Sequence, residues 1–283
     1  MKNKNDLAPI IIIGSPRSGT TILGNLLAEH PGLHYEEEPR LTWRYNNDNK
    51  SDFLTTKDLN ESKKKLIRDT FEKRLRKSGK KRLLEKTPSN ALRPEFVDAI
   101  FPDSKIIYIS RDPIECILSI RNLWLKKAHG IKNISKSNYL RRLREIHLSQ
   151  IPYYSMEFIR RSLPVWLRRG NTTNLWGPRF PGMRAMVKEI GILPVCCLQW
   201  RFCTEACDYF RQVHPDRMYQ LRLEAINEVS LLDLLRYCEL QDSETIIETF
   251  KLKFSSALIT KHRDSATEED LETIKRWIGP YFN

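Results

Sequence analysis

The stretch IIIIGSPRSGTT, residues 10–21, constrains the fold more than any other part of the chain. Four β-branched apolar residues lead directly into Gly14, and a second glycine follows at Gly19. This spacing matches the phosphate-binding pattern G-x-x-x-x-G-K-[ST], in which backbone N–H groups of a strand–loop–helix turn surround a phosphate. Thr20 occupies the lysine position of that pattern, and Arg17 stands inside the loop. The sequence therefore predicts an anion-binding loop whose positive charge comes from an arginine.

Apolar runs typical of short strands alternate with helical patterns through much of the chain. The predicted strands are Ile10–Ile13, Arg82–Lys86, Lys105–Ser110 and Arg217–Leu223. The predicted helices are Thr20–Glu29, Pro94–Phe101, Pro113–Trp124 and Val229–Glu239. Strands that alternate with helices form parallel sheets with right-handed crossovers. We therefore predict an α/β fold, a P-loop-type parallel sheet flanked by helices, which binds its ligands at the carboxyl ends of the strands.

Residues 125–200 interrupt this alternation with helical stretches, pairs of arginines and a turn-rich patch. We predict a single domain over residues 8–283, with 125–200 inserted in it as a mostly helical cap that selects the substrate. Several aromatic and basic side chains of the cap could line an acceptor site, although packing in the core is the alternative for most. They are Tyr153, Tyr154, Trp166, Trp176 and Arg179.

The chain is basic, with a formal net charge of +13 and a pI near 9.5. Such a charge favours a polyanionic partner, an anionic cofactor or an acidic membrane surface. Part of it lies in residues 63–82, where Lys and Arg surround an apolar helical stripe of Leu66 or Ile67, Phe71 and Leu75. This helix is either a solvated surface helix or a site for an acidic acceptor. Because aromatic side chains are not interleaved among its basic residues, we expect no nucleic-acid partner.

The N-terminus and the cysteines predict the compartment. The polar N-terminus leads into an apolar run far shorter than the roughly 20 residues of a membrane span. We expect no transmembrane segment and a cytoplasmic protein, or one from which a targeting segment has been removed. Six irregularly placed cysteines favour a reduced compartment. Cys203, Cys207 and His214 lack the usual metal-ligand spacing, so we predict no metal site.

A second candidate phosphate site lies in KIIYISRDPIECILSIRNLW, residues 105–124. Arg111 stands where a predicted strand ends, and Ser119 lies on the following helix, so both could contact one phosphate. Taken alone, Arg111 and Asp112 could equally pair and cap that helix. Taken with the first loop, they predict two separate phosphate sites, and hence a nucleotide that is phosphorylated at two places.

GSPRSGTT together with YISRDPIECILSIRN resembles the two cofactor-binding signatures of sulfotransferases that use 3′-phosphoadenosine 5′-phosphosulfate (PAPS). The resemblance implies PAPS as co-substrate, used without a metal. It implies that Arg111 and Ser119 bind the 3′-phosphate. The residues implied to bind the 5′-phosphosulfate are Arg17, Ser18, Gly19, Thr20 and Thr21.

Two further stretches resemble tyrosylprotein sulfotransferases and related bacterial sulfotransferases. In HPGLHYEEEPR, residues 30–40, the resemblance implies that Glu38 is the catalytic base and that Arg40 contacts the substrate. In LLEKTPSN, residues 83–90, it implies that Lys86 assists the transferring sulfuryl group.

The likeness is looser toward the C-terminus. LRLEAI, residues 221–226, is similar to the R-Y-E-D-L strand of the family, with Leu223 in the place of the tyrosine. TKHRDSATEED, residues 260–270, resembles the basic loop that closes over the cofactor. This resemblance implies that Lys261 and Arg263 contact the cofactor.

The physical roles of these residues fit sulfuryl transfer. A carboxylate beside the acceptor can act as a general base, an effect worth about 10² to 10⁴ in rate. We expect repulsion among the consecutive Glu36, Glu37 and Glu38 to raise the pKa of at least one of them. Lys86 and Arg17 supply positive charge where negative charge accumulates. The alternatives are a solvated turn for the glutamates and a surface position for Lys86.

We therefore predict a PAPS-dependent sulfotransferase that transfers a sulfuryl group in line to a hydroxyl or amine acceptor. Its predicted catalytic residues are Glu38, Lys86 and Arg17. The partners are a nucleotide co-substrate and an acceptor that is a sugar, a peptide tyrosine, a lipid or a metabolite. Two alternatives are a P-loop kinase acting with ATP and magnesium, and a non-enzymatic basic module that binds polyanions.

Overall fold

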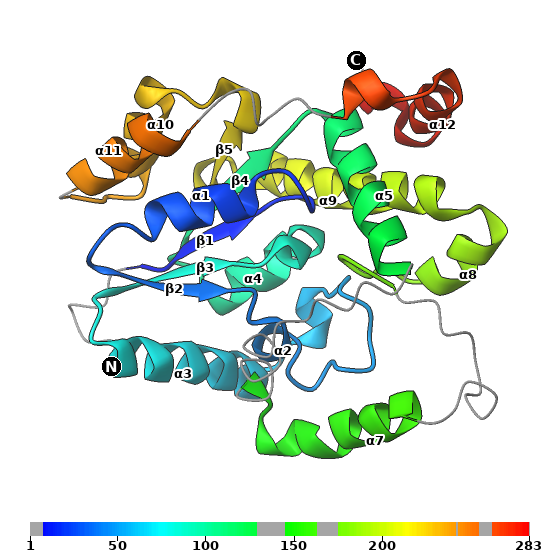
Figure 1. Ribbon diagram of the computed structural model, residues 1–283. Coiled ribbons are helices and arrows are strands. Elements are labelled where there is room, and N and C mark those ends of the chain that lie inside the picture. Colours follow the sequence, from blue (N-terminus) through cyan, green and yellow to red (C-terminus); the bar gives the residue numbers. More distant parts are fainter. Residues whose placement is uncertain (1–7, 129–144, 163–174, 242, 255–261, 283) are drawn as a thin grey trace.

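The computed structural model describes residues 8–128, 145–162, 175–241, 243–254 and 262–282. Its centre is a five-stranded parallel sheet in the order β2-β3-β1-β4-β5, with helices on both faces (Figure 1). The strands are β1 (Ile10–Ile13), β2 (Leu33–Glu37), β3 (Arg82–Lys86), β4 (Lys105–Ser110) and β5 (Met218–Arg222). This architecture confirms the predicted α/β fold.

The helices of the described residues differ widely in length. In chain order they are α1 (Thr20–Leu27), α2 (Arg40–Trp43), α3 (Glu61–Ser78), α4 (Pro94–Ile100), α5 (Pro113–Ala128), α7 (Ile151–Ser162), α8 (Met183–Glu189), α9 (Ile192–Val213), α10 (Glu228–Tyr237), α11 (Glu244–Lys253) and α12 (Glu268–Ile278). The short helical turn η2 (Pro88–Leu92) follows β3 directly.

Alternation along the central strand directs its side chains into two separate core clusters, one on each face of the sheet. Ile11 and Ile13 face a cluster that includes residues of α3, α4 and α9. Ile10 and Ile12 face the opposite cluster, with residues of α1, α10 and α11. All four isoleucines are fully buried, as expected for a strand that helices cover on both faces.

Strand β2 is the one strand of the sheet that the sequence analysis did not predict. Its residues, LHYEE, lack an apolar run, and their burial is mostly intermediate. The strand lies at the edge of the sheet and pairs only with β3, in a register that places Glu37 opposite Lys86. Because one side of an edge strand has no neighbouring strand, a polar sequence is tolerated there. The predicted strands β1, β3 and β4 have the expected bounds, and β5 is slightly shorter than predicted.

The basic segment 63–82 is helical only as far as Ser78, where α3 ends in a left-handed Gly79. Its apolar side is anchored by Ile67 and Phe71, which are both buried. Arg82 is not part of this helix, because it begins β3 and is itself buried.

Several basic side chains of α3 have structural partners, among them Lys63, which donates to Asn47 Oδ1 at 3.1 Å. Arg74 pairs with Glu36 of β2, and Arg68 donates to the carbonyl oxygen of Ile100. These contacts support the interpretation of α3 as a surface helix packed on the sheet.

The segment predicted as a cap holds α7, α8 and the first part of α9 in its described residues. Tyr154 donates its hydroxyl to Asp48 Oδ1 at 2.7 Å and lies edge-on to Tyr153. Trp176 is half-buried, and Trp166 lies outside the described residues. The single-domain organisation and the role of the cap remain predictions.

All six cysteines are buried free thiols, and burial raises the pKa of each. No helix in the described ranges has both the length and the apolar character that crossing a membrane requires.

Replacing Phe71 by Ala should destabilise the protein. Its ring packs against Trp43 and Phe101 at centroid distances of 5.3 and 5.8 Å. Loss of this buried ring is expected to lower the free energy of unfolding by about 3–5 kcal/mol. Urea unfolding measures the change, with the exposed Lys73→Ala on the same helix as the control. Equal stability of the two variants would show that α3 is not anchored through its apolar side.

Candidate active site

The loop after β1 depends on both of its glycines. A Cβ atom on Gly14 would lie 2.4 Å from the backbone oxygen of Ile109 on β4. Gly19 has φ +99°, and a Cβ there would lie 2.8 Å from Leu223 Cδ1. Leu223, where the resemblance expected a tyrosine, is buried and packs against the loop. Close packing of β4 and Leu223 thus holds the loop backbone in place for an anion.

Two loop side chains have the character of anion ligands. Ser18 is fully buried, and its hydroxyl has no hydrogen-bond partner among the described residues. A buried hydroxyl without a partner is costly, so this position fits a ligand oxygen. Arg17 is exposed and has φ +70°, a left-handed conformation that is uncommon outside glycine. Such conformations cluster at functional sites.

Lys86 lies at the centre of the site and is wholly buried. Its ammonium group donates to Thr21 Oγ1 at 3.0 Å, Glu38 Oε1 at 3.1 Å and Glu37 Oε1 at 3.2 Å. The interpretation of Lys86 as a surface lysine is therefore wrong. A buried ammonium requires anionic partners, and these contacts bring the loop, β3 and the end of β2 together.

The three consecutive glutamates do not share one environment. Along β2 successive side chains alternate between the two faces of the sheet. Glu36 pairs with His34 and Arg74, whereas Glu37 contacts Lys86. Glu38 has φ +53°, and this left-handed residue interrupts the alternation. Its carboxylate consequently joins that of Glu37 at Lys86.

The pKa of Glu38 is lower than its ordinary value of 4.5. Burial favours the neutral carboxyl group, but the charges of Arg40 and Lys86 and hydrogen bonds from both outweigh it. Arg40 Nη2 lies 2.9 Å from Glu38 Oε2, so each carboxylate oxygen has a cationic partner. The expectation that repulsion among the glutamates raises the pKa is thus wrong for the candidate base. Glu38 is ionised near neutral pH.

The second predicted phosphate site adjoins the first. Arg17 Nε donates to Ser119 Oγ on α5 at 3.0 Å. Arg111, at the end of β4, donates from Nη1 to the carbonyl oxygen of Arg17 at 3.1 Å. The strands β1 and β4 are neighbours in the sheet. Arg17 follows β1 and Arg111 follows β4, so both lie at the point where the strand order reverses direction, which is where α/β sheets bind their ligands.

Glu115 is a buried residue of this region that the sequence analysis missed. Its carboxylate accepts hydrogen bonds from Arg111 Nη2 at 3.0 Å and from the backbone N–H groups of His262 and Arg263 at 3.0 and 2.9 Å. It thereby connects the C-terminal segment to the second candidate phosphate site. The available signal was a carboxylate inside the apolar stretch of a helix.

The remaining C-terminal candidates have different outcomes. Arg263 Nη1 lies 3.3 Å from Asp112 Oδ2. Asp112 directly follows Arg111 in the sequence, so this contact brings Arg263 to the same part of the site. Asp112 also accepts from the backbone N–H of Glu115 at 2.9 Å and so caps α5. Lys261 lies outside the described residues.

Glu85, next to Lys86 on β3, is a second buried carboxyl group without a predicted role. It accepts hydrogen bonds from Trp43 Nε1 at 2.9 Å, Thr87 Oγ1 at 2.5 Å and Asn90 Nδ2 at 3.4 Å. Burial raises its pKa to about 7, against the opposing effect of these hydrogen bonds and of nearby cations. Through Trp43 it holds α2, the short helix that begins at Arg40.

Across the described ranges, no group of three or more His, Cys, Asp or Glu side chains is arranged to hold a metal ion.

The structure brings together seven of the predicted site residues through the contacts described above. They are Arg17, Thr21, Glu38, Arg40, Lys86, Arg111 and Ser119.

Comparison with known proteins identifies the family. The model of the sulfotransferase family matches residues 9–164, which include both candidate phosphate sites and the Glu38–Lys86 pair. The chain belongs to the sulfotransferase family. This sulfotransferase is also 24% identical over 139 residues to the nodulation protein NoeE of Sinorhizobium fredii (strain NBRC 101917 / NGR234). That match spans 42% of the chain and only 33% of NoeE.

The fold of this sulfotransferase can be compared with solved structures. Sulfotransferase STF9 from Mycobacterium avium superposes with a TM-score of 0.53 at 14% identity, over 96% of this chain and 76% of that one. The sulfotransferase domain of the Synechococcus PCC 7002 olefin synthase covers 99% of this chain and 90% of its own, with a TM-score of 0.48 and 15% identity. At these identities the STF9 superposition supports the fold alone.

Glu85 should make the stability of the sulfotransferase depend on pH. Its pKa in the folded state, about 7, lies above its ordinary value of 4.5. Because the folded state binds a proton at Glu85 more tightly than the unfolded state does, protonation of Glu85 stabilises the fold. This stabilisation is fully present below pH 4.5 and is lost as the pH rises through about 7. We expect Glu85→Gln, which stays neutral, to lose less stability than the wild type over this interval.

Urea unfolding at pH ~5 and pH ~8 measures this difference. Glu95→Gln, an exposed position on α4, is the matched control and should retain the wild-type pH dependence. A wild-type slope in Glu85→Gln would mean that Glu85 is not protonated in the folded state.

Proposed function

We propose that this sulfotransferase transfers a sulfuryl group from PAPS to a hydroxyl or amine acceptor, with Glu38 as the general base. One observation carries the proposal: the buried ammonium of Lys86 contacts both Thr21 of the loop and the carboxylate of Glu38. A cation that joins a phosphate-binding loop to a carboxylate suits a reaction in which a hydroxyl loses its proton beside an anionic donor.

The donor-binding residues divide into two groups. The loop residues Arg17, Ser18, Gly19, Thr20 and Thr21 would hold the 5′-phosphosulfate. The hydroxyl of Ser18, which has no hydrogen-bond partner in the described part of the chain, and the glycine-dependent loop backbone support this role.

Arg111 and Ser119 would hold the 3′-phosphate. The hydrogen bond between Arg17 and Ser119 supports a continuous site across both groups. Arg263 reaches this side of the site through Asp112 and is a further candidate for the same phosphate. When bound, PAPS supplies the sulfuryl group and leaves as adenosine 3′,5′-bisphosphate.

Glu38 would remove the acceptor's proton. Because its pKa is lowered, the carboxylate is available at neutral pH without prior deprotonation. Arg40, predicted to contact the substrate, holds the second carboxylate oxygen of Glu38 and so orients the base. Lys86 would oppose the negative charge that develops beside the loop, since its ammonium is already held between loop and base.

Binding of the product nucleotide tests the donor. We expect adenosine 3′,5′-bisphosphate without magnesium to bind and to raise the melting temperature, because a ligand of the folded state stabilises it. Arg111→Ala should weaken this binding at least ~10-fold, the loss expected for a charged hydrogen bond to phosphate. It should scarcely affect adenosine 5′-phosphate, which lacks the 3′-phosphate.

Isothermal titration of both nucleotides against both proteins provides the measurement. An equal loss for the two nucleotides would contradict the assignment of Arg111. Stabilisation only by ADP with magnesium would favour a kinase, and a response only to a polyanion such as heparin would favour a binding module.

Replacing Glu38 by Gln tests the base. We expect turnover to fall about 10²- to 10⁴-fold, because the amide cannot accept the proton. Binding of the bisphosphate should be unchanged. Transfer from radiolabelled PAPS to a panel of phenols, sugars and tyrosine peptides measures turnover.

Glu36→Gln is the matched control, since its carboxylate pairs with Arg74 and His34 away from Lys86. Wild-type turnover in Glu38→Gln would refute the role of Glu38 as base.

A further inference from the structure

Glu115 is a buried carboxylate beside the second candidate phosphate site, and the proposed function gives it no role. Only 1% of the residue is exposed. Its neighbours on α5, Ile114 and Cys116, are buried in an apolar cluster. Burying a carboxylate is costly unless it is paired and hydrogen-bonded, and its charge repels a nearby phosphate. A negative charge at this position therefore requires an explanation.

The two oxygens of the Glu115 carboxylate serve different segments of the chain. Oε2 accepts a hydrogen bond at 3.0 Å from Nη2 of Arg111, at the end of β4. Oε1 accepts from the backbone N–H groups of His262 and Arg263 at 3.0 and 2.9 Å. The N–H of His262 also lies 3.1 Å from Oε2. One carboxylate thus joins two segments that are far apart in the sequence.

A second carboxylate fixes the same junction. Asp112 Oδ1 accepts from the backbone N–H of Glu115 at 2.9 Å, and Asp112 Oδ2 lies 3.3 Å from Arg263 Nη1. The guanidinium groups of Arg111 and Arg263 are therefore each held by a carboxylate at the start of α5. Arg111 also donates to the carbonyl oxygen of Arg17, so the arrangement extends to the candidate phosphate-binding loop.

The C-terminal segment has further contacts along α5. Arg121 Nη1 lies 2.5 Å from Asp270 Oδ1, and Asn122 Nδ2 lies 3.4 Å from His262 Nδ1. Figure 1 shows the C-terminal elements beside the N-terminal end of α5. Glu115 differs from these further contacts because it also holds Arg111, a candidate ligand of the 3′-phosphate.

We propose that Glu115 is a positioning residue for the donor. It holds the guanidinium of Arg111 and the backbone of Arg263 together, so that both cations meet the 3′-phosphate and the enzyme discriminates against nucleotides that lack it. The proposal rests on the proposed function, in which these two arginines are the cations of that phosphate. The Glu115 carboxylate does not touch the nucleotide. Its charge opposes the phosphate, whereas its hydrogen bonds place the cations, and placement has the larger effect.

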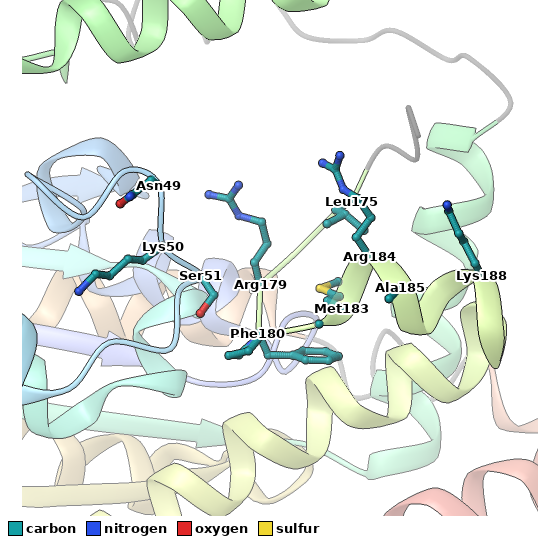
Figure 2. Close-up of a pocket in the computed structure, with 12 residues that line it drawn as sticks. Asn49, Lys50, Ser51, Leu175, Arg179, Phe180, Met183, Arg184, Ala185 and Lys188 are labelled. Carbon is teal, nitrogen blue, oxygen red and sulfur yellow. The ribbon is translucent and has the colours of Figure 1, made fainter. Parts of the chain in front are cut away.

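An open pocket beside α8 is separate from these contacts. It has a volume of about 570 Å³ and lies between residues 49–51 and the segment 175–188 (Figure 2). Neither Glu115 nor any residue assigned to the 3′-phosphate lines it. An effect of Glu115 on nucleotide binding therefore does not pass through the lining of this pocket.

Glu115→Gln tests the proposal, because placement and charge predict effects of opposite sign. Glutamine has one acceptor oxygen and presents N–H donors where the carboxylate accepts, so it cannot hold both segments. We expect adenosine 3′,5′-bisphosphate to weaken ~10-fold relative to adenosine 5′-phosphate, about the loss of one charged hydrogen bond. Loss of a negative charge alone would instead strengthen the bisphosphate. Isothermal titration of both nucleotides against wild type and variant measures the ratio of affinities.

This ratio separates placement from damage to the fold, because a partly unfolded variant loses apparent affinity for both nucleotides equally. Glu205→Gln on α9 is the matched control and should keep the wild-type ratio. Glu205 also pairs with an arginine four residues before it, Arg201, at 2.6 Å. In an Arg111→Ala background, Glu115→Gln should change the ratio less than it does in the wild type, because part of its effect passes through Arg111.

Amide hydrogen exchange of the wild-type protein gives a second measurement that needs no substitution. The backbone N–H groups of His262 and Arg263 are bonded to Glu115. We expect them to exchange more slowly with saturating bisphosphate than with saturating adenosine 5′-phosphate, because the 3′-phosphate would hold the same junction. NMR measures the two rates.

An unchanged or increased preference for the bisphosphate in Glu115→Gln would overturn the proposal. Equal exchange rates with the two nucleotides, or full additivity of the substitutions at Glu115 and Arg111, would overturn it as well. Failure of the proposed function is distinguishable, because the wild-type protein itself would then not bind the bisphosphate.

Discussion

The buried ammonium of Lys86 is the interaction on which the rest of the site depends. A charge removed from water is tolerated only beside opposite charge and hydrogen-bond acceptors. Lys86 finds these in Thr21, Glu37 and Glu38, from two other segments of the chain. Its requirement for partners therefore connects the candidate phosphate-binding loop with the end of β2. Together with Arg40, Lys86 lowers the pKa of Glu38 and keeps it ionised, so the cations that assemble the site also hold the proposed base in its charged form.

Backbone conformation completes the arrangement at two positions. Arg17 and Glu38 both adopt left-handed φ values, although neither is a glycine. At Glu38 this conformation brings a second carboxylate to Lys86, and at Arg17 it accompanies a side chain that reaches Ser119 on α5. Strain of this kind persists only where the surrounding structure compensates for it. The sheet register and the hydrogen bonds of the loop are that compensation.

Buried carboxyl groups support the site from both sides. Glu115 holds Arg111 and the C-terminal segment, whereas Glu85 holds Trp43 and, through Asn90 and Arg93, the framework that reaches Asp52. Each carboxyl group is buried and accepts several hydrogen bonds, which compensate for its burial.

The sequence by itself determined the central strands, the position of the candidate phosphate-binding loop and the identity of Lys86 and Glu38 as candidates. Strong local patterns carried that information: β-branched runs, glycine spacing and motifs of a few residues. Only the tertiary structure decided that LHYEE forms an edge strand, that Lys86 is buried, and that the pKa of Glu38 is lowered. These properties arise from contacts between segments far apart in the chain. Burial, which favours the neutral form of Glu38, is outweighed by the cations Arg40 and Lys86, which only the fold brings to its carboxylate.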